Sequence, residues 1–105
     1  MEKVVIIAYK PIEGKAEVLR ELVKKNLPCL KQHGLVTNKD SFILETKDGT
    51  IVEVFEWVSE KAMKTANTIP AIQDLWRQYA KVSTYTPLNR IPEAGNLFAA
   101  FSPLN

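Results

Sequence analysis

The stretch Ile51–Val82 constrains the fold more than any other part of the chain, because it reads as a strand that leads directly into an amphipathic helix. Ile51–Val58 alternates β-branched and aromatic residues with two glutamates, a pattern typical of a strand. Ser59 then offers a hydroxyl to the free amides of a first helical turn, and Glu60 suits the positive end of the helix dipole. The stretch therefore predicts a strand and a helix that share one core.

The helix that follows Ser59 has a single apolar stripe. Its members recur at steps of three and four residues, as on one face of an α-helix, and are Ala62, Met63, Ala66, Ile69, Ile72, Leu75, Trp76, Tyr79 and Val82. Pro70 interrupts the stripe, because proline lacks the amide donor and clashes with the preceding turn. We therefore expect a break near Asn67–Ile69 and a second helical piece with Pro70 in its first turn.

The N-terminal part predicts a strand at Lys3–Tyr9 and a helix at about Lys15–His33. The strand is apolar on both faces, so both faces need cover. The predicted buried stripe of the helix is Val18, Leu19, Leu22, Val23, Leu27 and Leu30. Pro28 is expected to bend its last turns, and Gly34 to end it in the left-handed conformation.

A β-hairpin is predicted between Ser41–Lys47 and the strand at Ile51, joined by Asp48-Gly49 in a type I′ turn. Ser83–Asn89 is a plausible fourth strand, and Pro87 suits an edge position. The final stretch from Pro92 is too apolar for a solvated tail, since it contains Leu97, Phe98 and Phe101. We expect it to form a short helix or turn that docks on its own subunit or on a partner.

The predicted order is β-α-β-β-α-β, an α+β, ferredoxin-like arrangement with a four-stranded antiparallel sheet and two helices on one face. Residues 1–105 form one such domain. Because two strands are apolar on both faces, the face opposite the helices would stay bare. A second copy of the same sheet would cover it, so we expect a homodimer paired through the sheet faces, a dimeric α/β barrel.

Charge and composition narrow the possible partners. The net charge of +2 is small and the basic residues are scattered, which disfavours nucleic-acid binding. Cys29 is the only cysteine, so it has no internal disulfide partner. No signal peptide or run of about 20 apolar residues is present, so we expect a cytoplasmic protein that does not enter a membrane.

Two segments resemble the antibiotic-biosynthesis monooxygenase family of dimeric α/β-barrel proteins: VEVFEWVSEKAMKTANTIPAIQDLWRQYA and VVIIAYKPIEGKAEVLREL. The first is similar to the family's strand that ends in an aromatic residue and Trp, followed by a cap, an Ala and two helical pieces. The second is similar to its opening strand and Gly-Lys turn into the first helix. The resemblance covers roughly Lys3–Phe101.

This resemblance implies a small monooxygenase without a cofactor that oxidises an aromatic or quinone-like molecule in a cavity between sheet and helices. Such chemistry needs a dry pocket, a group that takes or directs a proton, and donors for a developing oxyanion. The chain departs from the haem-degrading branch, because Trp76 and Ala66 stand where that branch has its iron-ligating His and a Trp. Asn67 stands where many members carry a His, which excludes a His-dependent step on this helix.

Five residues are candidates to border the cavity: Tyr9, Trp57, Asn67, Trp76 and Tyr79. The two Trp residues either stack on a substrate or serve as core or interface aromatics. The Tyr hydroxyls, including that of Tyr85, either donate to a substrate oxygen or face water. The Asn67 amide either faces the pocket or caps the first helical piece. No catalytic residue is assigned from the sequence.

Other titratable groups have plain alternatives. Glu53 and Glu56 fall on opposite faces of one strand, each either a partnered carboxylate or a buried base with a raised pKa. Cys29 and His33 lie four residues apart and could pair as thiolate and imidazole, or His33 could contact the last carbonyls of its helix. One His, one Cys and no clustered carboxylates cannot supply a metal site.

Two function classes remain open. One is a small oxygenase acting on an aromatic or quinone-like molecule. The other is a non-catalytic ligand-binding or stress-associated homodimer that keeps the fold and uses the cavity for an apolar ligand or fills it with side chains.

Overall fold

The computed structural model describes residues 1–105 and contains one antiparallel sheet with the strand order β4-β1-β3-β2-β5. The strands are β1 (Lys3–Pro11), β2 (Phe42–Glu45), β3 (Ile51–Trp57), β4 (Ser83–Thr86) and β5 (Ser102–Pro103). The helices are α1 (Ala16–Gln32), α2 (Glu60–Ala66) and α3 (Pro70–Val82), and two short 3₁₀ turns are η1 (Leu88–Arg90) and η2 (Pro92–Gly95). The first four strands follow the expected ferredoxin-like order, and β5 is a fifth strand that the sequence did not predict.

The ends of the helices follow the local sequence. The Ser59 hydroxyl accepts from the Ala62 amide at 3.0 Å and begins α2, and Pro70 takes the first turn of α3, so the predicted break between the two helices is confirmed. Gly34 has φ +68° just after α1, as expected of a helix end. The element α1 continues through Pro28 to Gln32, so this proline does not end the helix.

The hairpin between β2 and β3 differs from the predicted type I′ turn. Within the turn, only Gly49 has a positive φ. The Thr46 carbonyl accepts from the Gly49 amide at 3.1 Å, and the Thr46 amide donates to the Thr50 carbonyl at 2.9 Å. This pattern is a type I turn followed by a glycine bulge. The Asp48 carboxylate accepts from the Thr46 hydroxyl at 2.5 Å and from the Thr50 amide at 3.0 Å, which fixes the turn without a left-handed Asp48.

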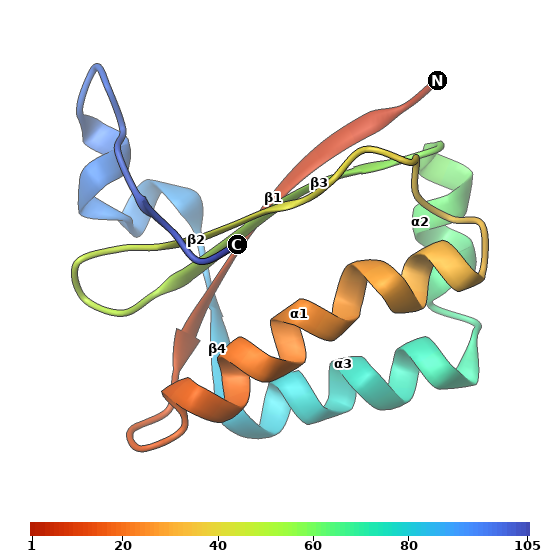
Figure 1. The fold of residues 1–105 in the computed structure, drawn as a ribbon, viewed down its shortest axis with the longest axis horizontal. Helices are drawn as coiled ribbons and strands as arrows, with labels where there is room; N and C mark the ends of the chain where they lie inside the picture. The colour runs from red at the N-terminus through yellow and green to blue at the C-terminus, as the bar shows by residue number, and fades with distance from the viewer.

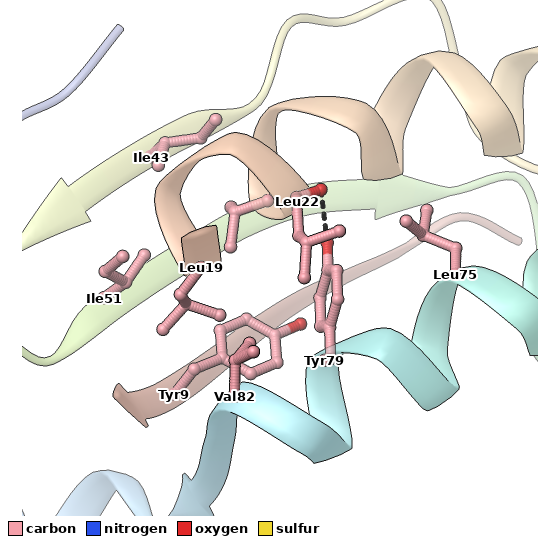
Figure 2. Packing of buried hydrophobic residues seen from close by; sticks show 9 residues of the cluster. Tyr9, Leu19, Leu22, Ile43, Ile51, Leu75, Tyr79 and Val82 are labelled. Atoms are coloured by element: carbon pink, nitrogen blue, oxygen red, sulfur yellow. Dashed lines mark hydrogen bonds between the residues drawn. The ribbon is translucent and has the colours of Figure 1, made fainter. Parts of the chain in front are cut away.

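The helices α1 and α3 lie side by side against one face of the sheet, as Figure 1 shows. Most of the predicted stripes are buried there, but Val18 is 46% exposed and Asn26, which was not predicted, is buried. One core cluster surrounds Tyr9 and Tyr79 (Figure 2), and a second surrounds Phe55 and Trp57.

The opposite face is partly covered by the chain's own C-terminal segment. Ile91 packs on Ala8 and Val52, with Phe101 beside them. In Figure 1 this segment lies on the side of the sheet away from α1 and α3. The expectation of a wholly bare face is therefore wrong at this end of the sheet. Leu97 and Phe98, expected to dock, are 93% and 85% exposed within the subunit.

The other end of this face stays apolar and open. Ile6, Val54 and Phe42 are cross-strand neighbours there, and Val4 continues the row. Val4, Ile6 and Phe42 are 61%, 50% and 64% exposed. No helix is long and apolar enough to span a membrane.

Candidate functional site

An apolar pocket of about 320 Å³ opens on the helix side of the sheet. Its lining comes from β1, β3, α1, α2, α3 and β4, and Asn26 is the one residue of the lining that is neither apolar nor aromatic. The lining residues are Val5, Ile6, Ile7, Tyr9, Asn26, Phe55, Trp57, Met63, Trp76 and Tyr85. A small pocket of this kind, apolar with few polar groups, is typical of a site for a small hydrophobic ligand.

Behind this lining lies the carboxylate of Glu53, which is fully buried. The strand β3 turns Glu53 towards the helices, because Ile51, Glu53 and Phe55 alternate onto that face. Its Oε1 accepts from the Tyr9 hydroxyl at 3.2 Å and from Asn26 Nδ2 at 3.3 Å, and its Oε2 accepts from the same Asn26 Nδ2 at 3.1 Å. Two side chains that line the pocket therefore hold the buried carboxylate.

Asn26 joins this network to α3. Its Oδ1 accepts from the indole Nε1 of Trp76 at 3.0 Å, while its Nδ2 donates to Glu53. The amide orientation is thus determined on both sides, since an indole can only donate and an ionised carboxylate can only accept. This series of hydrogen bonds, Trp76–Asn26–Glu53–Tyr9, connects α3, α1, β3 and β1.

The Glu53 carboxylate has no cation to balance it. All of its hydrogen-bond donors are neutral, and no Lys, Arg or His forms an ion pair with it. Burial raises the pKa of Glu53 to about 7, although the hydrogen bonds from Asn26 and Tyr9 act to lower it. A carboxyl group that titrates near neutral pH can take up and release a proton under ordinary conditions.

The tyrosines near Glu53 stay protonated. Burial, with the charge of Glu53 as the next cause, raises the pKa of Tyr9 and of Tyr79 far above the ordinary value. The rings of Tyr9 and Tyr79 meet edge to face with their centroids 5.1 Å apart, and the ring centroid of Tyr85 lies 5.4 Å from that of Tyr9. Tyr9 therefore serves as a hydrogen-bond donor to Glu53 and not as a base.

Three of the five predicted cavity residues line the pocket together: Tyr9, Trp57 and Trp76. Tyr79 lies in the core beside them, and its hydroxyl donates to the Leu22 carbonyl at 3.2 Å, as Figure 2 shows. Asn67 is exposed at the end of α2, away from the lining, because the Pro70 break turns the chain outward there. Its backbone carbonyl accepts from the Gln73 side chain.

Sequence reasoning missed Asn26 as a site residue. Its position between Val23 and Leu27 on the predicted buried stripe of α1 carried the signal, because a polar residue on an apolar stripe needs a buried partner. The alternative of a raised pKa at Glu53 was considered, but the residues that hold it come from distant parts of the sequence.

The other titratable candidates have structural roles. His33 Nδ1 lies 3.0 Å from the Cys29 carbonyl oxygen, so the imidazole contacts the end of its helix and not the thiol. Glu56, on the other face of β3, pairs with Lys39 at 3.2 Å. No group of three or more His, Cys, Asp or Glu side chains is arranged to hold a metal ion.

Comparisons with protein-family models, curated proteins and solved structures found no match to this chain.

Proposed function

We propose that this protein binds a small, neutral, planar aromatic molecule of the phenol or quinol class in the apolar pocket, and that Glu53 takes up its proton. The observation that carries the proposal is the buried, uncompensated Glu53 carboxylate held by Tyr9 and Asn26, two residues of the pocket lining. Burying an ionised carboxylate without a cation costs free energy, so its presence in the core points to a functional role. A neutral ligand is favoured because the pocket lining carries no charged side chain.

Tyr9 supplies the route for the proton. A phenol hydroxyl that donates to the Tyr9 oxygen can pass its proton on as Tyr9 passes its own to Glu53. The carboxylate becomes a carboxylic acid, Tyr9 regains its proton, and a phenolate remains in the pocket. The aromatic rings of Trp57, Trp76 and Phe55 offer faces on which a planar ring can stack.

A phenolate can give electrons directly to dioxygen, so this step suits an oxygenase without a cofactor, the activity implied by the resemblance to the antibiotic-biosynthesis monooxygenases. The balanced reaction is phenol plus dioxygen to quinone plus water: one oxygen atom enters the ring at a C–H carbon and the other leaves as water. The phenol loses four electrons and dioxygen gains four. Glu53 receives the phenolic proton and returns it to the water that forms.

The test is oxygen consumption with a panel of quinols and polycyclic phenols, measured against pH. The rate should rise with pH as Glu53 loses its proton near pH 7, since only the carboxylate is a base. Glu53→Gln should lower the rate by about a hundredfold or more, in the range of general base catalysis, and Tyr9→Phe should also lower it. Tyr79→Phe is the matched control, because its hydroxyl bonds to the Leu22 carbonyl and not to Glu53.

A second candidate, ligand binding without turnover, is favoured by a different observation. Asn26 has its amide donor and acceptor both satisfied inside the chain, so the network is complete without a substrate. Quenching of Trp fluorescence by the same panel, with no oxygen uptake for any compound, would support this function and exclude the oxygenase.

We also propose that a second copy of the chain covers the open end of the sheet face at Val4, Ile6 and Phe42. These side chains form an apolar row on a flat sheet surface, and a two-fold pairing places each row against the other. Ile6→Lys should convert a dimer into a folded monomer in size-exclusion chromatography with light scattering. A wild-type monomer at micromolar concentration would exclude the pairing.

A further inference from the structure

A second pocket, of about 340 Å³, lies at the β4 edge and has a different kind of lining. It is built where the end of β1, the hairpin turn between β2 and β3, β4 and the 3₁₀ turns meet. The residues that line it are Lys10, Thr46, Asp48, Thr50, Thr84, Tyr85, Thr86, Pro87, Arg90, Ile91 and Pro92. Its lining is rich in hydroxyl groups and contains two cations, in contrast to the apolar pocket.

The two cations of the lining outnumber its one carboxylate. Neither Lys10 nor Arg90 forms an ion pair. The one carboxylate of the lining, Asp48, is already engaged within its turn by the Thr46 hydroxyl and the Thr50 amide. These hydrogen bonds, and to a smaller degree the charge of Lys10, lower the pKa of Asp48, so it stays ionised and the pocket keeps a net charge of one positive unit.

The fold holds the lining of this pocket in place. Lys10 and Thr84 are register partners across β1 and β4, and Ala8 and Thr86 are the next pair on the same face, so their side chains point to the same side of the sheet. Ile91 is buried against the sheet and fixes the backbone next to Arg90. Glu93 accepts from the Lys47 amide at 2.9 Å and ties the 3₁₀ turns to the hairpin.

We propose that this pocket binds a small anion with several hydroxyl groups, a phosphorylated or carboxylated polyol. The Arg90 guanidinium and the Lys10 ammonium would bind the oxyanion, because charged donors form their strongest hydrogen bonds with phosphate or carboxylate oxygens. The hydroxyls of Thr84 and Thr86 and the free oxygen of Asp48 would bind the ligand's hydroxyls. This site shares only Tyr85 with the apolar pocket, and it does not rest on the oxygenase proposal.

The test is titration calorimetry at low salt with glucose 6-phosphate, gluconate and glucose. The phosphate and the carboxylate distinguish the two sources of negative charge, and glucose is the neutral match. At least one anion should bind, glucose should not, and raising the salt concentration should weaken binding. Binding of glucose as tight as that of the anions, or binding of none of the three, would overturn the proposal.

Variants locate the site. Arg90→Gln and Lys10→Gln should each weaken binding about tenfold, the effect of losing one charge-assisted hydrogen bond. Arg77→Gln and Lys81→Gln, on the exposed side of α3, are the matched controls and should bind as the wild type does. Glu53→Gln should also bind normally, which separates this site from the apolar pocket. Equal loss in the control variants would show a general charge effect and refute the assignment.

Discussion

Replacing Glu53 with Gln should change how the stability of the protein depends on pH. In the folded state the pKa of Glu53 is raised from 4.5 to about 7 by burial, while in the unfolded chain it is ordinary. At pH values between these two pKa values, Glu53 holds a proton in the folded protein that it has released in the unfolded chain. The free energy of unfolding therefore falls as pH rises through this window, and no further contribution from Glu53 arises above it.

The size of this change in the free energy of unfolding follows from the shift in the pKa of Glu53. One pKa unit corresponds to about 1.4 kcal/mol, so the shift from 4.5 to about 7 corresponds to about 3 kcal/mol of stability lost across the window. Stability from this group is fully present below the unfolded-state pKa and is lost by the folded-state pKa. Gln has no proton to release, so the Glu53→Gln protein should gain about 3 kcal/mol relative to the wild type as pH rises through the window.

Urea unfolding followed by the fluorescence of Trp57 and Trp76, at fixed protein concentration and at pH values from about 4 to 9, measures this difference. Other groups that titrate in this range are present in both proteins and cancel in the comparison. Any fixed cost of placing an amide beside Asn26 shifts the whole curve and leaves its slope with pH unchanged.

The control is Tyr79→Phe, because burial raises the pKa of Tyr79 far above its ordinary value and its hydroxyl therefore exchanges no proton in the pH range of the assay. This variant should keep the wild-type slope. If Glu53→Gln also keeps the wild-type slope, then the pKa of Glu53 is the same in the folded and unfolded states, and Glu53 cannot be the group that exchanges a proton near pH 7.

Three further predictions concern the stability of the fold around the site. Ser59→Ala removes the cap of α2 and should cost about 1 kcal/mol in urea unfolding, while Ser102→Ala, on the exposed β5, should cost little. Tyr79→Phe removes a buried hydrogen bond to the Leu22 carbonyl, which keeps its place in α1, and should cost about 1 kcal/mol; an unchanged midpoint would show that this bond contributes nothing. Gly49→Ala should cost about 1 kcal/mol or more, because φ there is +89°, and an equal loss in Gly95→Ala would refute that reason.

Sequence patterns predicted the elements well where one local signal dominated. Ser59 begins α2 through a side-chain bond to a nearby amide, and Pro70 breaks the helix because it lacks an amide donor, so neither effect needs a distant partner. The hairpin was also found, but its turn type was wrong, because the Asp48 side chain bonds to Thr46 and Thr50 and stabilises a three-residue loop in place of a two-residue one.

Features that depend on distant contacts were predicted less well. The strand β5 forms only because the C-terminal segment returns to β2, and two residues carry too little pattern to reveal it. In the pocket, Tyr9, Trp57 and Trp76 lie together as aromatic residues of the core face, but the place of Asn26 depends on α1, β3 and α3 meeting around Glu53. Asn67 was a candidate partly because of the resemblance to a family, but the turn before Pro70 places it outside the lining of the pocket.

The return of the C-terminal segment also determines which part of the sheet can meet another protein chain. A bare edge strand offers unpaired amides and carbonyls to any neighbouring strand and invites aggregation. Here β5 pairs along β2, and Asn105 adds bonds from its side chain to Ser41 and Ile43 at 2.8 and 3.0 Å. Removal of the last five residues should therefore turn β2 into an open edge, so that chains pair strand to strand into aggregates.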